Sequence, residues 1–296
     1  DPEGVEAAFR DAVHHVTETY VHQRLIPAPM ETRGVAVVPA PHNGDMTLYS
    51  STQIPHVLKV MASITLGVPE QKLRVIAPAV GGGFGCKLNV YAEEILCMAL
   101  AQRHRVPVRW TESRSEAAVA TIQGRAQRQT IELAADADGK LTVVRATILA
   151  DMGAYLQLVA PGVPLLGAFL YHGLYDVPLY SFTCKSVFTN LTPTDAYRGA
   201  GRPEATYAIE RAMDSLALAV GVGPDEIRSR NFIPTEKFPY DSPAGLVFDS
   251  GNYQPALDRA KELIGWDERL AEQADRRASG STTHLGIGIS TYVEMC

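Results

Sequence analysis

Apolar residues follow two different periods along the chain. Residues 19–26, 34–40 and 46–52 carry apolar side chains in short runs bounded by proline and by a His-Asn-Gly turn, which is typical of strands. Residues 56–67 instead place apolar residues at helical spacing and end at Gly67, two residues before Pro69. The first part of the chain therefore predicts strands followed by a helix.

The rest of the chain mixes the same two patterns. The pattern predicts a strand at 72–80, a helix at 89–105, a strand at 106–113, and a hairpin over 128–151 that turns at the Asp-Gly of 138 and 139. Residues 156–195 contain four prolines and are expected to be irregular, whereas helices are expected at 204–221, 225–233 and 253–265. Strands and helices without strict βαβ alternation predict an α+β, or mixed α/β, fold.

Composition narrows the class of protein. The 296 residues are 46% apolar and 20% charged, with a net charge of −6, which is ordinary for a globular protein and argues against nucleic acid as the main partner. No apolar run is long enough for a membrane span and the first residues do not resemble a signal peptide, so we expect a cytoplasmic location. The four cysteines lack CxxC spacing, which predicts buried thiols rather than a zinc site: Cys86, Cys97, Cys184 and Cys296.

The stretch VGGGFGCKL, residues 80–88, sets four glycines around Phe84. It fits neither the P-loop nor the dinucleotide fingerprint. Its place between a predicted strand and a predicted helix favours an anion site made by free backbone N–H groups at the helix start. Phe84 does not suit a phosphate site, so its ring either fills the core or stands beside something bound.

Two other stretches carry chemistry. Arg198 lies in a glycine-bracketed turn, AYRGAGR, immediately before a predicted helix, where it either binds an anion or simply pairs at the surface. Gln53 ends a predicted strand and precedes a helix, and by itself indicates no more than a cap. Met30 and Glu31 are expected in a structural loop, and Asp225, Glu226 and Arg228 on a solvated helix face.

Taken together, these stretches resemble the molybdenum-binding large subunit of the xanthine oxidase family, which includes aldehyde oxidases and aerobic carbon monoxide dehydrogenase. That family has a Gln in an S-T-Q segment, a GGGFGxK loop and a later A-[FY]-R turn before a long helix. Here Gln53 lies 31 residues before Phe84, and Arg198 stands in AYRGAGR, a form typical of the second type of carbon monoxide dehydrogenase large subunit.

The resemblance implies a molybdenum–molybdopterin cofactor, in the cytosine dinucleotide form known from bacteria. It implies that Gln53, Phe84 and Arg198 surround the metal without ligating it, and that the remaining cofactor-binding residues come from the glycine loop and the turn: Gly82, Gly83, Gly85, Gly199 and Ala200. The expected reaction is oxidation of CO, an aldehyde or an N-heterocycle with water as oxygen source. Electrons then leave through 2Fe-2S clusters and FAD on partner subunits, in a dimer of heterotrimers.

The substrate positions depart from those of purine oxidases. Leu88 stands where such relatives carry Glu, Leu166 where they carry Arg, and Ala200 where they carry a stacking Phe. A site without hydrogen-bonding groups rejects a polar heterocycle, so xanthine is not expected as substrate. Gly199 also replaces the copper-binding Cys of carbon monoxide dehydrogenase proper.

The resemblance further implies a domain order. Residues 1–280 would form the first molybdenum-cofactor-binding domain, without the small N-terminal hammerhead-like domain, and 281–296 would begin the second. The alternating run 286–296 predicts a core strand, and a domain rarely ends inside one, so we expect a piece of a longer chain. The general-base Glu would then lie beyond residue 296, and Glu294 is not a candidate for it. Two alternatives remain: a cofactor-less structural or assembly protein of the same fold, and a phosphate-binding enzyme.

Overall fold

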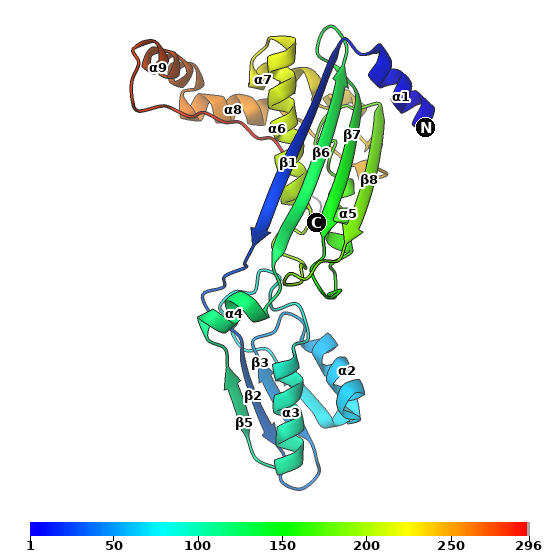
Figure 1. Ribbon diagram of the computed structural model, residues 1–296, viewed down its shortest axis with the longest axis vertical. Helices are drawn as coiled ribbons and strands as arrows, with labels where there is room; N and C mark the ends of the chain where they lie inside the picture. Colours follow the sequence, from blue (N-terminus) through cyan, green and yellow to red (C-terminus); the bar gives the residue numbers. More distant parts are fainter. Residues whose placement is uncertain (295–296) are drawn as a thin grey trace.

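A long antiparallel hairpin organises the larger of the two lobes in the computed structural model, which describes residues 1–294 (Figure 1). The hairpin belongs to a four-stranded sheet of order β1-β6-β7-β8, in which β8 is parallel to β7. The strands are β1 (His14–Leu25), β6 (Gly124–Ala135), β7 (Leu141–Asp151) and β8 (Leu179–Val187). The predicted hairpin turn is confirmed, since Asp136 Oδ1 accepts the backbone N–H groups of Asp138 and Lys140.

Helices cover both faces of this sheet, and the alternation along β7 sorts its residues between them. Val144 belongs to the main core, which packs the sheet against α6 (Arg202–Val220). The adjacent Val143 points to the opposite face and packs against α1 (Pro2–Asp11). Two shorter helices pack against α6: α7 (Pro224–Asn231), which adds Ile227 to the main core, and α5 (Gly162–Ala168), which also contacts β7 and β8.

The smaller lobe is an insertion between β1 and β6. Its sheet has the order β4-β3-β2-β5, and α2 and α3 pack on it over a separate core. Its elements are β2 (Gly34–Pro39), β3 (Met46–Ser50), α2 (Pro55–Leu66), η1 (Glu70–Lys72), β4 (Leu73–Ile76), α3 (Ala92–His104) and β5 (Val108–Thr111). A short helix, α4 (Arg114–Ala120), leads back at the junction of the lobes (Figure 1). The β1–β6 ladder closes at Leu25 and Gly124, so both crossings between the lobes start from one end of that ladder.

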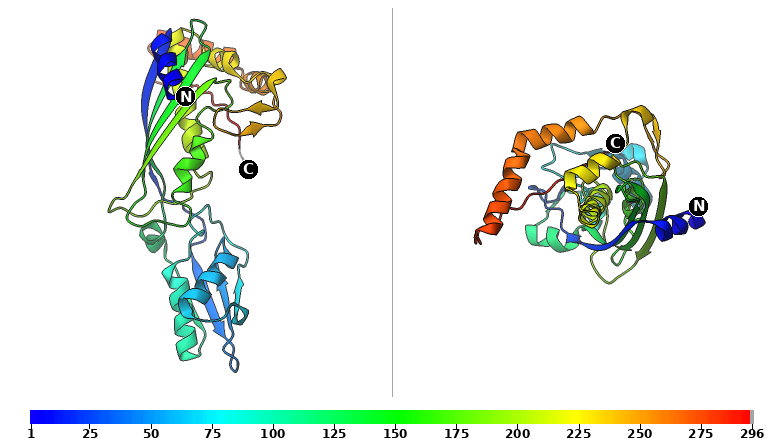
Figure 2. Two further views of the ribbon diagram at one scale, coloured as in Figure 1. Left: turned by 90° about the vertical axis from the view of Figure 1, so that its right-hand side faces the viewer. Right: turned by 90° about the horizontal axis from the view of Figure 1, so that it is seen from above.

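Residues 235–278, after α7, form a set of smaller elements. These are η2 (Thr235–Lys237), the small ribbon of β9 (Tyr240–Asp241) and β10 (Val247–Phe248), α8 (Gln254–Ile264) and α9 (Trp266–Ala278). Seen from above, α8 and α9 lie on the side opposite α1 (Figure 2). Along the described residues of the chain, no helix is long and apolar enough to cross a bilayer.

The mixed α/β class is confirmed, but three local predictions are wrong. Residues 156–195 are not irregular throughout, because they contain α5 and β8, whose parallel pairing with β7 is non-local. Residues 286–294 form no strand: they are extended, and alternate residues such as Ile289 and Val293 pack on the main core without a ladder partner. The end of this predicted strand, residues 295–296 with Cys296, lies outside the described part of the chain.

The third wrong prediction concerns Arg228 on the helix face at 225–228, where Glu226 is exposed as predicted. Arg228 is fully buried, and its Nε lies 2.9 Å from Glu210 Oε2 while Nη1 lies 2.9 Å from Asp214 Oδ1. Glu210 also accepts the Thr291 backbone N–H at 2.7 Å, so this ion pair fastens the extended C-terminal segment to α6. The sequence pattern missed it because all these partners are distant in sequence or on another helix.

Candidate functional site

The glycine loop, residues 81–85, lies at the junction of the lobes between β4 and α3. Its backbone is left-handed at Gly82 (φ +93°), Phe84 (φ +53°) and Gly85 (φ +99°). A Cβ on Gly85 would lie 1.8 Å from the carbonyl oxygen of Ala196, which belongs to the large lobe. Glycine is therefore required at 85 because two backbones from different lobes come into direct contact there.

Phe84 and Arg198 are brought together by this contact. The backbone N–H of Arg198 donates to the carbonyl of Phe84 at 3.0 Å, and its guanidinium carbon lies 5.9 Å from the centroid of the Phe84 ring. The Phe84 side chain is 40% exposed, and Arg198 is exposed as well. Of the two interpretations of Phe84, the structure supports a ring at the surface of the site and not a core residue.

Gln53 follows β3 and precedes α2, as predicted, and it braces the glycine loop. Its Oε1 accepts the backbone N–H of Gly85 at 2.9 Å and that of Lys87 at 3.3 Å. A Cβ on Gly83 would lie 2.3 Å from the same oxygen. Because both partners are donors, they fix the orientation of the amide and direct the Nε2 donor away from the loop. The oxygen of the Gln53 amide thus holds the loop, and its Nε2 group can donate to a bound group.

Sequence reasoning missed two residues that hold the loop from the other side. Glu31 Oε2 accepts the Gly81 N–H at 2.6 Å and lies 3.1 Å from the buried Lys87 Nζ. Partial burial opposes ionisation of Glu31, but the Gly81 N–H and the Lys87 ammonium outweigh it, so the pKa of Glu31 lies below its usual value. The only signal in the sequence was the Lys of the GGGFGxK pattern, whose partner lies 56 residues away.

The turn that carries Arg198 is left-handed at three successive residues. The φ angles are +97° at Gly199, +41° at Ala200 and +94° at Gly201. A Cβ on Gly201 would lie 2.0 Å from the carbonyl oxygen of Val163, so the turn is in contact with α5. The α6 helix begins immediately afterwards at Arg202, as the sequence predicts.

The three predicted substrate positions surround this junction. Ala200 is in the turn, Leu166 lies on α5 one turn after Val163, and Leu88 follows the glycine loop. Leu88 and Leu166 are half-buried. The structure therefore brings the segments that carry these positions to one region.

A cleft of about 680 Å³ opens beside Arg198. Gly199, Arg202 and Tyr207 line one wall, and Tyr292 and Glu294 of the extended C-terminal segment line the other. Arg202 Nε lies 2.6 Å from Glu294 Oε1, an ion pair across the cleft. Glu294 is thus bound to an arginine.

The predicted anion site at the helix start is wrong. The α3 helix begins at Ala92, several residues after the last glycine, and Glu94 accepts the Tyr91 N–H at 2.9 Å. A carboxylate already occupies the end of the helix where a phosphate would bind. This removes the main support for the phosphate-binding alternative.

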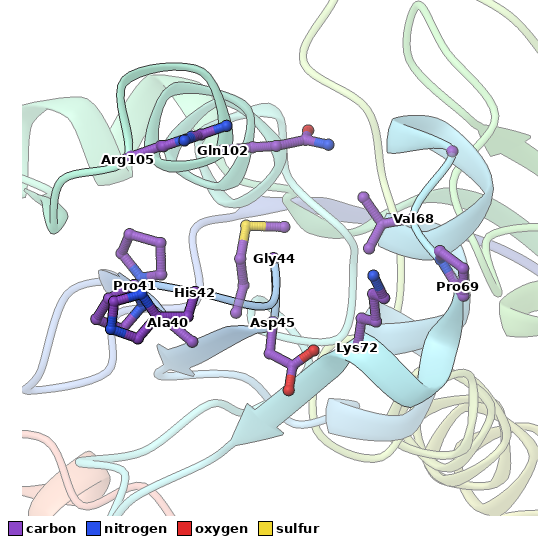
Figure 3. Close-up of a pocket in the computed structure, with 13 residues that line it drawn as sticks. Ala40, Pro41, His42, Gly44, Asp45, Val68, Pro69, Lys72, Gln102 and Arg105 are labelled. Carbon is purple, nitrogen blue, oxygen red and sulfur yellow. The ribbon is translucent and has the colours of Figure 1, made fainter.

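The three sequence motifs do not line the cavity at the far end of the small lobe. This cavity has a volume of about 360 Å³, and Figure 3 shows Lys72, Gln102 and Arg105 around it. Within residues 1–294, no group of three or more His, Cys, Asp or Glu side chains could hold a metal ion. Cys86 is buried, which raises the pKa of its thiol and agrees with the prediction of a core residue.

Comparison with known proteins decides the family. The model of the molybdopterin cofactor-binding domain matches residues 2–232. The chain belongs to this family. The match covers both lobes, the glycine loop and the Arg198 turn, and the predicted resemblance is confirmed.

Relatives from this family are large subunits of oxidoreductases. The chain is 37% identical to the carbon monoxide dehydrogenase large chain of Hydrogenophaga pseudoflava, over 100% of this chain and 37% of that protein. It is 38% identical to the nicotine 6-hydroxylase large subunit of Paenarthrobacter nicotinovorans, over 98% of this chain and 35% of that protein. The chain therefore spans little more than a third of the length of the relatives it matches.

Solved structures agree with the fold. The quinoline 2-oxidoreductase of Pseudomonas putida 86 superimposes with a TM-score of 0.88 at 31% identity, covering 93% of this chain and 35% of that chain. The CO dehydrogenase of Oligotropha carboxidovorans gives a TM-score of 0.86 at 35% identity, covering 94% and 35%. These proteins share one fold around different substrates, so the fold does not by itself identify the substrate.

Proposed function

We propose that this chain is part of the catalytic subunit of a molybdenum hydroxylase, which oxidises a small substrate with water as the oxygen source. The observation that carries the proposal is the meeting of Gln53, Phe84 and Arg198 at one junction. These residues come from three separate segments and two lobes, and they bring an amide, a half-exposed ring and an exposed guanidinium together at the surface.

The residues at the junction suit a molybdopterin. Gly82 and Gly83 carry no side chain where the Phe84 ring and the Gln53 amide lie: an added Cβ would lie 2.7 Å from the Phe84 ring at Gly82 and 2.3 Å from Gln53 Oε1 at Gly83. The glycines therefore let the loop fold closely around these two groups. Gln53 Nε2 and the Arg198 guanidinium are donors that match oxo and phosphate oxygens, which only accept hydrogen bonds. Gly85, Gly199 and Ala200 shape the two backbone segments that hold these donors in place. If the pterin carries a cytosine dinucleotide, the cleft beside Arg198 offers room and positive charge for its diphosphate.

When bound, the cofactor supplies the two-electron oxidation chemistry of molybdenum. The contribution of this chain is to orient it. Gln53 is held by two loop N–H groups, so its donor needs little reorganisation when charge develops at the metal. Phe84 presents a ring that limits access of water, and Arg198 places a permanent positive charge beside the site.

The predicted substrate positions offer no side-chain hydrogen bonds: they are Leu88, Leu166 and Ala200. They favour a substrate that makes few hydrogen bonds to the protein. We expect CO, an aldehyde or a weakly polar N-heterocycle, and not xanthine. Gly199 has no thiol, and Cys86 is buried with a raised pKa, so neither position offers an accessible thiolate for copper. The copper-dependent form of CO oxidation is therefore not expected of this chain.

The rest of the assembly is proposed from the family. The general-base Glu would come from a part of the subunit beyond residue 296, and the division into domains at residue 280 stays a prediction. Iron–sulfur and flavin subunits would accept the electrons, in a dimer of heterotrimers, and the location would be the cytoplasm. The cofactor-less paralogue remains the second candidate function, and the first experiment below separates the two.

The test is metal analysis of the intact complex, followed by a substitution at Gln53. We expect molybdenum close to one atom per large subunit; a folded complex without molybdenum would instead support the cofactor-less alternative. Gln53→Glu keeps an oxygen for the loop N–H groups and replaces only the Nε2 donor. We expect it to lower kcat by about tenfold or more, as for loss of one transition-state donor. Gln102→Glu, a matched change on α3 at the far cavity, should leave kcat unchanged.

A further inference from the structure

The turn from Tyr197 to Gly201 adopts a conformation that its sequence does not favour. Three successive residues have positive φ, and one of them, Ala200, is not glycine. A non-glycine residue in the left-handed region costs about 1 kcal/mol or more, so contacts elsewhere must maintain the turn. The residues that make these contacts control where Arg198 lies.

Arg125 makes three of them. Its Nη2 donates to the carbonyl of Arg198 at 2.9 Å, and its Nη1 donates to the carbonyl of Tyr197 at 3.3 Å. Its guanidinium carbon lies 4.7 Å from the centroid of the Tyr197 ring. One planar group thus holds two successive carbonyls and the ring between them, which a lysine could not do.

Glu204 completes the arrangement from the first turn of α6. Its side chain is fully buried; Oε1 lies 3.1 Å from Arg125 Nη1, and Oε2 accepts the Gly201 N–H at 3.0 Å. The ion pair of Arg125 and Glu204 therefore contacts the turn at both ends, at the carbonyls of Tyr197 and Arg198 and at the N–H of Gly201.

The backbone of β6 is itself distorted at Arg125. Arg125 (φ +65°) and Ala126 (φ +58°) are both left-handed, although neither is glycine and both lie in a strand. A Cβ on the preceding Gly124 would lie 2.4 Å from Tyr197 Cβ, so the strand runs directly against the turn. Unfavourable backbone geometry thus occurs on both sides of a single contact, which is a feature typical of functional sites.

We propose that Arg125, paired with Glu204, is a positioning residue that holds the Arg198 turn against the glycine loop. The path is short: Arg125 binds the carbonyl of Arg198, and the N–H of Arg198 binds the carbonyl of Phe84. Loss of the guanidinium releases the turn and, through that hydrogen bond, the left-handed conformation of Phe84. The link to catalysis rests on the proposed function, whereas the link between the turn and the loop does not.

The experiment measures hydrogen exchange in the intact complex, in peptides covering residues 81–88 and 195–202. Arg125→Met alone would leave Glu204 as an unpaired buried charge, so it is paired with Glu204→Gln, which keeps an acceptor for Gly201. Arg125→Lys tests the need for a planar group, and Arg145→Met is the control, because Arg145 pairs with Glu132 on the same sheet away from the turn.

We expect the double variant to raise exchange about tenfold in both peptides, since it removes charge-assisted hydrogen bonds. Arg125→Lys should give a smaller rise, and Arg145→Met none. In the molybdenum-loaded enzyme the double variant should also shift the Mo(V) electron paramagnetic resonance signal. Unchanged exchange in the 81–88 peptide would overturn the proposal. A wild-type complex without molybdenum would refute the proposed function, while the exchange result would still decide whether Arg125 positions the loop.

Discussion

Gly85 is the position at which the contact between the lobes can be tested most directly. An alanine there would place its Cβ 1.8 Å from the carbonyl oxygen of Ala196, whereas real Cβ contacts essentially never fall under 3.0 Å. The backbone of one lobe must therefore move by more than an ångström, and a backbone atom cannot rotate away as a side chain can. Gly85→Ala also forces a side chain into φ +99°.

A matched control separates the cost of the collision with Ala196 from the cost of the positive φ angle. Gly221, which ends α6, has φ +83° and nothing within 4 Å of an added Cβ, so Gly221→Ala carries the conformational cost alone. We expect that variant to lower the free energy of unfolding by about 1 kcal/mol. Gly85→Ala should cost about 2–4 kcal/mol in total, because overpacking adds roughly 1–3 kcal/mol to the same conformational term.

The assay is urea unfolding of the intact chain, together with the molybdenum content of the assembled complex. Gly85→Ala should reduce molybdenum content while Gly221→Ala leaves it unchanged. Only Gly85→Ala displaces the backbone at Ala196, which leads into the Arg198 turn beside Phe84. Equal losses of stability in the two variants would refute the reasoning, since the collision would then contribute nothing.

Three further predictions concern ionisable side chains. Burial lowers the pKa of His172 from 6.5 to about 4. Between these two pH values the unfolded state binds the proton more tightly than the folded state, so the free energy of unfolding falls as pH drops from 6.5 to about 4. His172→Leu should remove about 2.4 kcal/mol of this acid sensitivity, measured by urea unfolding at pH 7 and pH 4.5. Arg228→Met leaves Glu210 buried and unpaired and should cost about 3–5 kcal/mol, whereas changing both to apolar residues should cost much less. The pKa of Glu31 lies below its usual value, so its bond to Lys87 stabilises the loop at neutral pH and is lost in acid, as pH falls through that lowered pKa. Glu31→Gln should abolish this acid-dependent part of the protection of the loop from proteolysis.

Local patterns predicted most helices and several strands because their causes are local. The α2 helix ends at Gly67 in a left-handed conformation, and the hairpin turns at Asp138 and Gly139, as spacing and turn residues require. The parallel strand β8 was missed because its partner, β7, is about forty residues away and no short-range signal records that pairing. The predicted strand at 286–296 failed, in its described part, for the converse reason: alternation sorts inward from outward residues but does not provide a ladder partner.

The sequence alone determined the chemical types at the site and the family to which they belong. Gln53, Phe84, Arg198 and the glycines were identified by order and spacing, which are properties of the chain. Only the tertiary structure decided what holds them, because the carbonyl contact at Gly85, the Glu31–Lys87 pair and the Arg125–Glu204 pair join segments from 56 to 111 residues apart. Such contacts depend on the direction of backbone N–H and C=O groups in the folded chain, and the identity of the side chains does not specify that direction.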